Sequence, residues 1–526
     1  MQKLSVLDTT LRDGCQGVKI SYTVQDRLKI ISLLDDFGVT YIELGNPTYS
    51  PKDAELFSKL KSLNLKNSRL ACFGATRRIG KKAEEDSSLK SIAESVAPAA
   101  VIFGKAWDLH VTDILGTDLS ENLSMIYDSV RFLADHGKEV IFDAEHFFDG
   151  YKNNPDYALK AVGAAYDAGA STVCLCDTNG GAFPDEIESA VAAVRKAFGR
   201  EVGIHAHNDG AMAVSNSIFA VNGGATHVQG TMIGTGERCG NANLSAVIAN
   251  LQLKRGFNIV PDISALTYTC RAISDISNLS MRDLPYVGKN AFSHKAGTHI
   301  DGVMKNPSSF EHIDPETVGN DRTFLMSDFA GKSAAYSMMK KIIPGITKDS
   351  PEIAKVLARL KELEFKGYQF EGAPASFELE IRRVLNLNKK EFFHLDRLRL
   401  LIEQDSKRDT DGYSSAYIKV FAGGEEEITA CDSSSGPVNA MDSAIRKSLE
   451  RFYPEISAVR LTDYKVRVID SDSATSAMVR VMIESSDSVN SWTTVGVSKD
   501  VIMASKKALL DSIEYYLIKH DKSEGC

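Results

Sequence analysis

Thr172-Val-Cys-Leu-Cys176 and Val202-Gly-Ile-His-Ala-His207 are two short apolar runs, and a helical pattern over Pro184–Phe198 separates them. Each run has the length of a β-strand, and the segment between them carries apolar residues at helical spacing. Strands that alternate with helices are typical of β-α-β units in a parallel sheet. This stretch therefore predicts a parallel sheet.

The same alternation continues on both sides of this unit. Further strand patterns lie at Leu4–Leu7, Tyr41–Leu44, Arg69–Phe73, Ala100–Phe103, Glu139–Asp143 and Thr226–Gln229. Helical patterns lie at Val24–Phe37, from Pro51 onward, and at Glu121–His136, Pro155–Ala168 and Ala211–Val221. Eight strands joined by crossovers within about 250 residues predict a (β/α)8 TIM barrel. The alternative is a doubly wound open sheet, but no G-x-G-x-x-G follows the first strand.

A chain of 526 residues is too long for one ordinary core. We expect a barrel over residues 1–265, a helical accessory segment over 266–372, and a C-terminal α+β domain over 373–526. The last part contains an internal repeat, because Ala416-Tyr-Ile-Lys-Val420 resembles Ala477-Met-Val-Arg-Val481 and a helical pattern follows each. The repeat carries no catalytic cluster, which favours a regulatory or dimerisation role.

The composition is 43% hydrophobic and 25% charged, as in soluble globular proteins. A net charge of −9 and the lack of basic runs argue against nucleic-acid partners. No apolar run approaches membrane-spanning length, and the N-terminus leads directly into a strand pattern. We therefore expect no signal peptide, no membrane partner and a cytoplasmic location. Eight scattered cysteines indicate reduced thiols, and we interpret Cys174 and Cys176 as core residues.

His205 and His207 project from the same face of their predicted strand. Neutral imidazole is a common ligand of divalent transition metals. The alternative is a hydrogen-bonded pair within the core. Other polar residues follow the predicted strands at Asp8–Asp13, Glu43, Asp143–His146, Asp177–Asn179, Gln229 and Thr231. Because active sites of barrels lie at the carboxyl ends of the strands, this clustering favours a metal site.

Two loops supply further candidate ligands. Asp13, in Asp8-Thr-Thr-Leu-Arg-Asp-Gly-Cys-Gln16, has a hard oxygen that could join the two histidines on one ion. Arg12 beside it can stabilise an enolate or carbonyl oxygen, although a simple loop ion pair with Asp13 is the alternative. Asn241, which ends Gly234-Thr-Gly-Glu-Arg-Cys-Gly-Asn241, offers an amide oxygen.

Taken together, the motifs Leu11-Arg-Asp-Gly-Cys-Gln16, His205-Ala-His-Asn-Asp209 and Gly234–Asn241 resemble the 2-isopropylmalate synthase, homocitrate synthase and citramalate synthase family. The resemblance covers nearly the whole chain. It implies a catalytic TIM barrel and a C-terminal, LeuA-type domain that binds an amino-acid inhibitor. It also implies a divalent metal ion (Mn²⁺, Mg²⁺ or Zn²⁺) with the ligands Asp13, His205, His207 and Asn241.

Two further stretches, Phe103–His110 and Phe142–Tyr151, resemble the citramalate synthase branch of that family. The resemblance implies an acyltransferase that condenses acetyl-CoA with pyruvate and water in isoleucine biosynthesis. It implies isoleucine or leucine as the allosteric inhibitor, and a homodimer. The roles that it implies are catalysis by Arg12, Glu145 and His299, and substrate binding by Arg12 and Thr178.

Departures and alternatives remain at this stage. Phe310 stands where relatives often have tyrosine, so it lacks a hydroxyl for proton transfer. Bulky side chains beside the metal would select pyruvate. Phe103 and Phe142 lie in strand-end stretches that could supply this bulk, and the sequence leaves open which of the two rings faces inward. The alternatives are a 2-isopropylmalate synthase that uses 2-oxoisovalerate, an acyl-CoA lyase of the same barrel family, and a non-catalytic amino-acid sensor. The C-terminal repeat argues against the lyase, and the intact metal ligands argue against the sensor.

Overall fold

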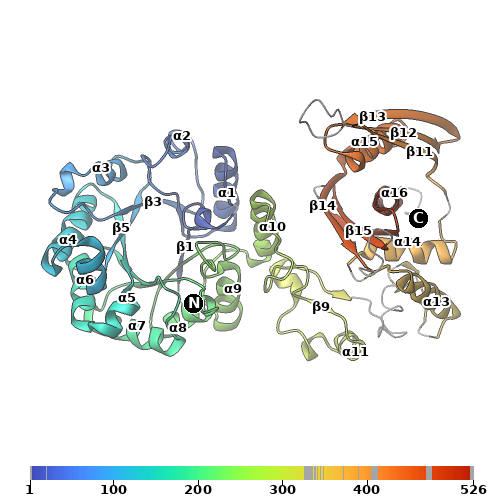
Figure 1. Ribbon diagram of the computed structural model, residues 1–526. Helices are drawn as coiled ribbons and strands as arrows, with labels where there is room; N and C mark the ends of the chain where they lie inside the picture. Colours follow the sequence, from blue (N-terminus) through green and yellow to red (C-terminus); the bar gives the residue numbers. More distant parts are fainter. Residues whose placement is uncertain are drawn as a thin grey trace. The chain divides into compact units, whose positions relative to one another are not determined.

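The computed structural model describes residues 3–18, 20–324, 336, 339–340, 342–343, 345–347, 349–370, 372–388, 390–403, 413–469, 477–487 and 489–521. The chain divides into two compact units (Figure 1). The first unit contains residues 1–292 and 312–322, and the second contains residues 293–311 and 323–526.

A closed barrel of parallel strands, paired in the order of the sequence, forms the centre of the first unit. Its strands are β1 (Ser5–Asp8), β2 (Tyr41–Glu43), β3 (Arg69–Ala75), β4 (Ala99–Lys105), β5 (Glu139–Glu145), β6 (Thr172–Asp177), β7 (Val202–Ala206) and β8 (His227–Gly230). The barrel closes where β1 pairs with β8. The predicted TIM barrel and its eight strands are therefore confirmed.

Helices surround the barrel (Figure 1). They are α1 (Val24–Phe37), α2 (Pro51–Leu60), α3 (Ser87–Ala93), α4 (Leu119–Asp135), α5 (Phe147–Asn153), α6 (Pro155–Ala168), α7 (Pro184–Phe198), α8 (Ala213–Asn222), α9 (Leu244–Ala249) and α10 (Leu266–Ser277). Local signals set their ends: Thr23 and Asp26 form a capping box at α1, and Gly38 ends that helix at a φ of 90°. The helices that the sequence pattern missed, α3, α5 and α9, are too short to show a helical period.

Alternate residues of each strand face different layers of the core. Val101 and Ile141 belong to the apolar cluster inside the barrel. Ile102 and Phe142 belong to the larger cluster between the barrel and its helices. Phe142 therefore points away from the barrel interior, so of the two aromatic candidates it is not the one that supplies bulk there. Phe103 lies two positions after Val101 on β4, so its side chain faces the barrel interior as that of Val101 does.

The second unit begins with short elements and ends with two copies of one motif. Its first elements are β9 (Ser293–His294), α11 (Gly297–Lys305), β10 (Thr323–Phe324), α13 (Pro351–Phe365) and α14 (Pro374–Val384). The first copy consists of β11 (Phe393–Glu403), β12 (Tyr413–Ala422), β13 (Glu425–Ser433) and α15 (Pro437–Glu450). The second copy consists of β14 (Arg460–Val468), β15 (Val479–Ser486), β16 (Ser491–Ser498) and α16 (Val501–His520).

Each copy is a three-stranded antiparallel sheet followed by a helix, which confirms the predicted α+β repeat. The two helices share one core, where Ala444 and Ile445 of α15 belong to the same cluster as Ala508 and Ile513 of α16. Among the residues that the structure describes, no helix is both long enough and apolar enough to cross a membrane.

Candidate active site

Four predicted ligands meet at the carboxyl end of the barrel. Asp13 lies in the loop after β1, His205 lies on β7, His207 follows directly after it, and Asn241 lies in the loop after β8. A backbone bridge between His207 and Asn241 ties the last two segments together. All four side chains are buried. Residues that are up to 228 positions apart in the chain are thus brought to one place.

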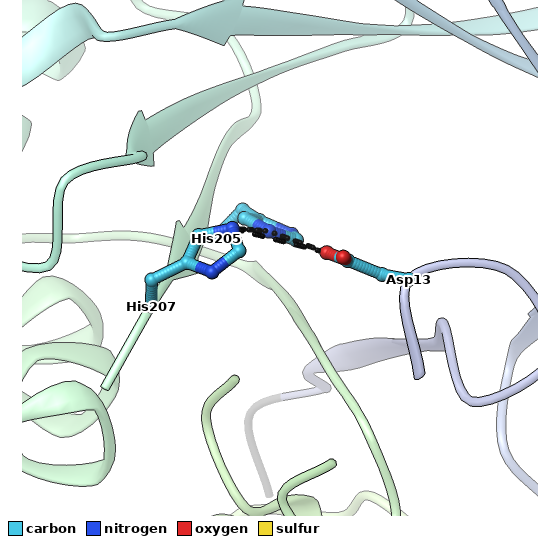
Figure 2. Close-up of side chains that lie close together, drawn as sticks. All are labelled: Asp13, His205 and His207. Atoms are coloured by element: carbon cyan, nitrogen blue, oxygen red, sulfur yellow. Dashed lines mark hydrogen bonds and ion pairs between the residues drawn. The ribbon is translucent and has the colours of Figure 1, made fainter. Parts of the chain in front are cut away.

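The Asp13 carboxylate is the centre of this group (Figure 2). Its Oδ2 lies 3.2 Å from His205 Nε2 and 3.9 Å from His207 Nε2. Asn241 Nδ2 donates a hydrogen bond to the same oxygen at 2.7 Å. The two imidazoles approach each other with their Nε2 atoms 3.3 Å apart. One ligand atom from each of Asp13, His205 and His207 can be chosen so that all three lie within 4.8 Å of one another.

The charges around these groups keep a ligand set ready for a cation. Burial alone would raise the pKa of Asp13, but Arg12 and the two histidines hold it well below its usual range. Burial, together with the nearby His205, lowers the pKa of His207 to about 4. At neutral pH the Asp13 side chain is therefore an anion, and the His207 ring is neutral with a lone pair available.

These residues fit a divalent cation. The side-chain oxygen Oδ1 of Asn241 and the ring nitrogen Nδ1 of His207 are buried and have no hydrogen-bond partner among the described residues. Buried polar atoms without partners are rare unless a ligand or water satisfies them. A carboxylate, two imidazoles and an amide oxygen suit Mn²⁺ or Zn²⁺, whereas Mg²⁺ prefers oxygen ligands.

Arg12 lies beside the ligand group and is held on two sides. Its Nε donates to Glu43 Oε2 at 2.6 Å, and its guanidinium carbon lies 3.7 Å from the centre of the Phe73 ring. Its Nη1 lies 3.7 Å from Asp13 Oδ2. Burial raises the pKa of Glu43 to about 7 despite the nearby Arg12. The sequence placed Glu43 at a strand end without giving it a role, and it did not single out Phe73.

Phe73 and Phe103 form an aromatic pair inside the mouth of the barrel. Their rings stack with centroids 5.3 Å apart, and Arg12 covers the Phe73 ring. The cationic group that faces the ligand group is therefore backed by two bulky apolar side chains.

Glu145 is the last residue of β5, and Thr178 directly follows the neighbouring strand β6. The Glu145 carboxylate forms an ion pair with Lys105 at the end of β4. The backbone N–H of His146 donates to Thr178 Oγ1 at 2.9 Å. Because this hydroxyl oxygen already accepts a hydrogen bond, its own hydrogen is directed elsewhere and can be donated to a substrate. Among the described residues, no hydrogen bond or ion pair joins Glu145 or Thr178 directly to Asp13, His205 or His207.

His146 shows a strained backbone and a cluster that the sequence did not reveal. Its φ of 56° is unusual for a residue with a side chain, and such strain gathers at functional sites. Its ring stands 4.1 Å from the ring of His110, which stacks on Trp107 at 5.2 Å. Its Nδ1 lies 3.1 Å from Asp149 Oδ2. No sequence pattern foretells a left-handed histidine.

His299, the remaining predicted site residue, lies on α11 in the second unit. Its ring stacks on Phe310 with centroids 4.2 Å apart. Gly302, one turn along α11, makes room for this ring, because a Cβ there would lie 2.5 Å from a ring carbon of Phe310. His294 in the same unit forms a separate buried pair with Glu311 at 2.9 Å.

Asp143, Cys174 and Cys176 form a second group with metal-ligand spacing. Burial raises the pKa of Cys176 to about 11 and that of Cys174 well above its usual value. Both thiols therefore stay protonated at neutral pH, and Cys174 packs in the apolar cluster inside the barrel. These observations favour the interpretation of the two cysteines as core residues.

A closed parallel barrel with carboxylate and imidazole groups at the carboxyl ends of its strands defines the class of this protein as a TIM barrel with a candidate metal centre. The chain belongs to the HMGL-like family, whose sequence profile matches residues 3–278. A homocitrate synthase post-HMGL domain-like profile matches residues 286–367. The LeuA allosteric (dimerisation) domain profile matches residues 371–517, which cover the first copy of the α+β repeat and the second as far as the last turn of α16.

Curated relatives place the chain more narrowly within this family. It is 49% identical to the (R)-citramalate synthase of Aquifex aeolicus, over 100% of this chain and 99% of that protein. It is 44% identical to the (R)-citramalate synthase of Geobacter sulfurreducens, again over 100% and 99%. The 2-isopropylmalate synthase of Sulfolobus acidocaldarius is 33% identical, over 71% of this chain and 94% of that protein. The chain is thus an enzyme of the group that contains these synthases.

Proposed function

We propose that this enzyme condenses acetyl-CoA with pyruvate and water to give citramalate and CoA. The observation that carries the proposal is Arg12, which lies beside the Asp13, His205 and His207 group and against the stacked pair of Phe73 and Phe103. Full-length identity to proteins named (R)-citramalate synthase supports the same reaction.

The acceptor 2-oxo acid would be oriented by groups at the carboxyl ends of four strands, β1, β6, β7 and β8. Asp13, His205, His207 and Asn241 would hold a divalent ion, which when bound polarises a carbonyl group as a Lewis acid. The hydroxyl of Thr178 has its hydrogen free and would donate it to the substrate carboxylate. The Phe73 and Phe103 rings would limit the space for the side chain of the acid, which favours the methyl group of pyruvate over an isopropyl group.

The carbon–carbon bond requires an enolate of the acetyl thioester. We assign the base to His299, assisted by Glu145, and the proton comes from the methyl group of acetyl-CoA. Arg12 then stabilises the negative charge on the enolate oxygen by a charge-assisted hydrogen bond. The enolate carbon bonds to the keto carbon of pyruvate, the carbonyl double bond opens, and the former keto oxygen takes up a proton to become the hydroxyl of citramalate. Water then hydrolyses the thioester to release CoA.

Thiol release from acetyl-CoA tests this proposal. The purified full chain is assayed with Mn²⁺ or Mg²⁺ and with pyruvate, 2-oxobutyrate, 2-oxoisovalerate or 2-oxoglutarate. We expect a strong preference for pyruvate, and we expect a chelator to abolish thiol release. Equal or greater thiol release with 2-oxoisovalerate would contradict the pocket argument, and absence of release with every acid would contradict the synthase assignment.

A 2-isopropylmalate synthase is the second candidate, because a relative of that name is 33% identical. Removing bulk from the aromatic pair distinguishes the two candidates. In a citramalate synthase, Phe103→Ala should raise activity with 2-oxoisovalerate relative to pyruvate, since the pocket gains volume. One methylene in an apolar pocket changes selectivity by about 10- to 200-fold, so a shift of at least tenfold is expected. Phe142→Ala is the control, because that ring lies outside the barrel interior.

We also propose feedback inhibition and a homodimer. The LeuA allosteric (dimerisation) domain profile, which matches residues 371–517, supports both proposals. Isoleucine is the expected inhibitor because citramalate leads toward its synthesis, and leucine is the alternative. Light scattering should give twice the mass of the 57.4 kDa chain. Inhibition by leucine alone would overturn the assignment of isoleucine, and a monomer would overturn the dimer.

A further inference from the structure

We propose that Gln229 is a positioning residue that holds His205 in the tautomer needed for metal binding. The inference rests on the proposed metal site and extends it to a residue that does not touch the metal. Gln229 lies on β8 directly opposite His205 on β7. Its side chain joins His205 to Asp143 on β5, so three strands of the barrel meet in one hydrogen-bonded chain.

The distances define a continuous chain of hydrogen bonds. Gln229 Nε2 donates to Asp143 Oδ1 at 2.8 Å. Gln229 Oε1 lies 3.0 Å from His205 Nδ1. All three side chains are buried, and Gln229 is completely so. Water is therefore excluded as a competing partner for the amide.

The chemistry of each group decides the direction of these bonds. A carboxylate can only accept hydrogen bonds, so Asp143 requires the NH₂ end of Gln229 to face it. The oxygen end of the amide then faces His205. Because an amide oxygen also only accepts, His205 Nδ1 must carry the hydrogen.

The consequence appears on the other side of the ring. A neutral imidazole with hydrogen on Nδ1 keeps its lone pair on Nε2. His205 Nε2 is the atom that lies 3.2 Å from Asp13 Oδ2 and 3.3 Å from His207 Nε2. Without a cation, Nε2 faces the Asp13 carboxylate, which only accepts hydrogen bonds, so Nε2 carries a hydrogen as well. Once that hydrogen is lost on metal binding, Nδ1–H stays on Gln229 and the lone pair on Nε2 is directed at the ligand group, as partners of metal-binding histidines generally arrange.

His207 provides an internal contrast. Its Nδ1 is buried but has no hydrogen-bond partner among the described residues. No amide or carboxylate thus holds the Nδ1 atom of His207 as Gln229 holds that of His205, although Nε2 of His207 faces His205 and Asp13. Of these two rings, only that of His205 is expected to have its Nδ1 hydrogen fixed by a partner among the described residues.

The first experiment reads the tautomer directly. Protein labelled with ¹⁵N at histidine is studied without metal by long-range ¹H–¹⁵N NMR, and His205→Gln assigns the signals. Above the pH at which the His205 ring loses its second proton, we expect the Nδ1–H form at His205 in the wild-type chain. The Nε2–H form at His205 would overturn the inference, whatever the protein's affinity for metal.

The second experiment measures Mn²⁺ affinity. Gln229→Met keeps the length of the side chain and removes both hydrogen bonds, so Mn²⁺ affinity should fall by about 10- to 100-fold. A double variant, Gln229→Glu with Asp143→Asn, exchanges donor and acceptor between the two positions. Its introduced amide can donate to the introduced carboxylate, which still accepts from His205, so the Nδ1–H form should return.

The outcomes separate this inference from the proposed reaction. If folded Gln229→Met binds Mn²⁺ within twofold of wild type, the positioning role is wrong while the metal site stands. If Gln229→Met fails to fold, the wild-type tautomer and the double variant still decide. If the wild-type chain does not bind Mn²⁺, the proposed metal site is wrong, and the tautomer measurement continues to test the role of Gln229.

Discussion

Gly236 in the loop after β8 should be essential for metal binding although it offers no ligand. A Cβ placed on Gly236 would lie 2.0 Å from Asn241 Oδ1 and 2.9 Å from Asn241 Cγ. It would also lie 3.2 Å from the backbone nitrogen of Asn241, so the backbone gives little room for relief. Gly236→Ala must therefore push the Asn241 amide out of its present position.

The size of this displacement sets the expected effect. The 2.0 Å contact is 1.4 Å shorter than the 3.4 Å at which ordinary van der Waals contact begins. Metal ligands tolerate deviations of only about 0.2 Å from their preferred distances. The variant should therefore lose Asn241 as a ligand. We expect Mn²⁺ affinity to fall by at least about tenfold, which corresponds to about 1.4 kcal/mol.

Isothermal titration of Mn²⁺ into the metal-free protein measures this loss. Gly181→Ala, after β6, is the matched control, because a Cβ there meets nothing within 4 Å. It should bind Mn²⁺ as the wild type does. If Gly236→Ala also bound Mn²⁺ with wild-type affinity, Asn241 would not be a ligand and the reasoning from the loop geometry would fail.

Three further predictions concern the barrel and the second unit. Burial raises the pKa of Asp8 to about 7, so its contribution to metal-free stability is complete below the unfolded pKa and is lost as the pH rises toward 7. Asp8→Asn removes this titration. Urea unfolding at pH 4 and pH 8 should show that, between these pH values, the wild type loses on the order of 3 kcal/mol more free energy of unfolding than the variant does. The same pH dependence in both proteins would contradict this prediction. Arg12→Lys should lower kcat by at least about 100-fold but leave Mn²⁺ binding intact, because lysine lacks the fork that reaches Glu43 and the substrate together; unchanged kcat in the thiol assay would remove Arg12 from catalysis. Gly496→Ala should destabilise the second unit by about 3 kcal/mol, since its Cβ would lie 2.0 Å from the backbone oxygen of Ala504 in α16. Calorimetry should show one unfolding transition at a lower temperature than in the wild type, and the Mn²⁺ affinity should be unchanged.

Much of the fold could be predicted because the relevant signals are local. The helices over Val24–Phe37, Pro155–Ala168 and Pro184–Phe198 have the predicted bounds, since each has a capping residue or an N-terminal proline and ends at a glycine. Short apolar runs located every strand of the barrel. The helix α5 was missed because it has only 7 residues, and because His146, the residue just before it, has a left-handed backbone that no pattern announces.

In the candidate site too, some features follow from local sequence signals and others depend on contacts between distant strands. His205 and His207 stand at alternate positions at the end of β7, and loops after β1 and β8 carry Asp13 and Asn241, so residue order made these side chains candidates, and the family resemblance implied the ligand set. Its neighbours could not. Glu43 and Gln229 were visible as polar residues at strand ends, but their pairing with Arg12 and His205 depends on which strands adjoin and in what register.

The sequence by itself determined the order of strands and helices, the closed barrel that follows from it, and the kinds of side chain at the ends of the strands. These properties depend on periodicity and chemistry within short segments. Only the tertiary structure decided that Phe103 faces inward to stack on Phe73 while Phe142 faces the helices. On the paired strands β4 and β5, Phe103 lies opposite Asp143, one position beyond Phe142, so the two phenylalanine side chains point in opposite directions. This register is set by contacts between strands that lie far apart in the chain.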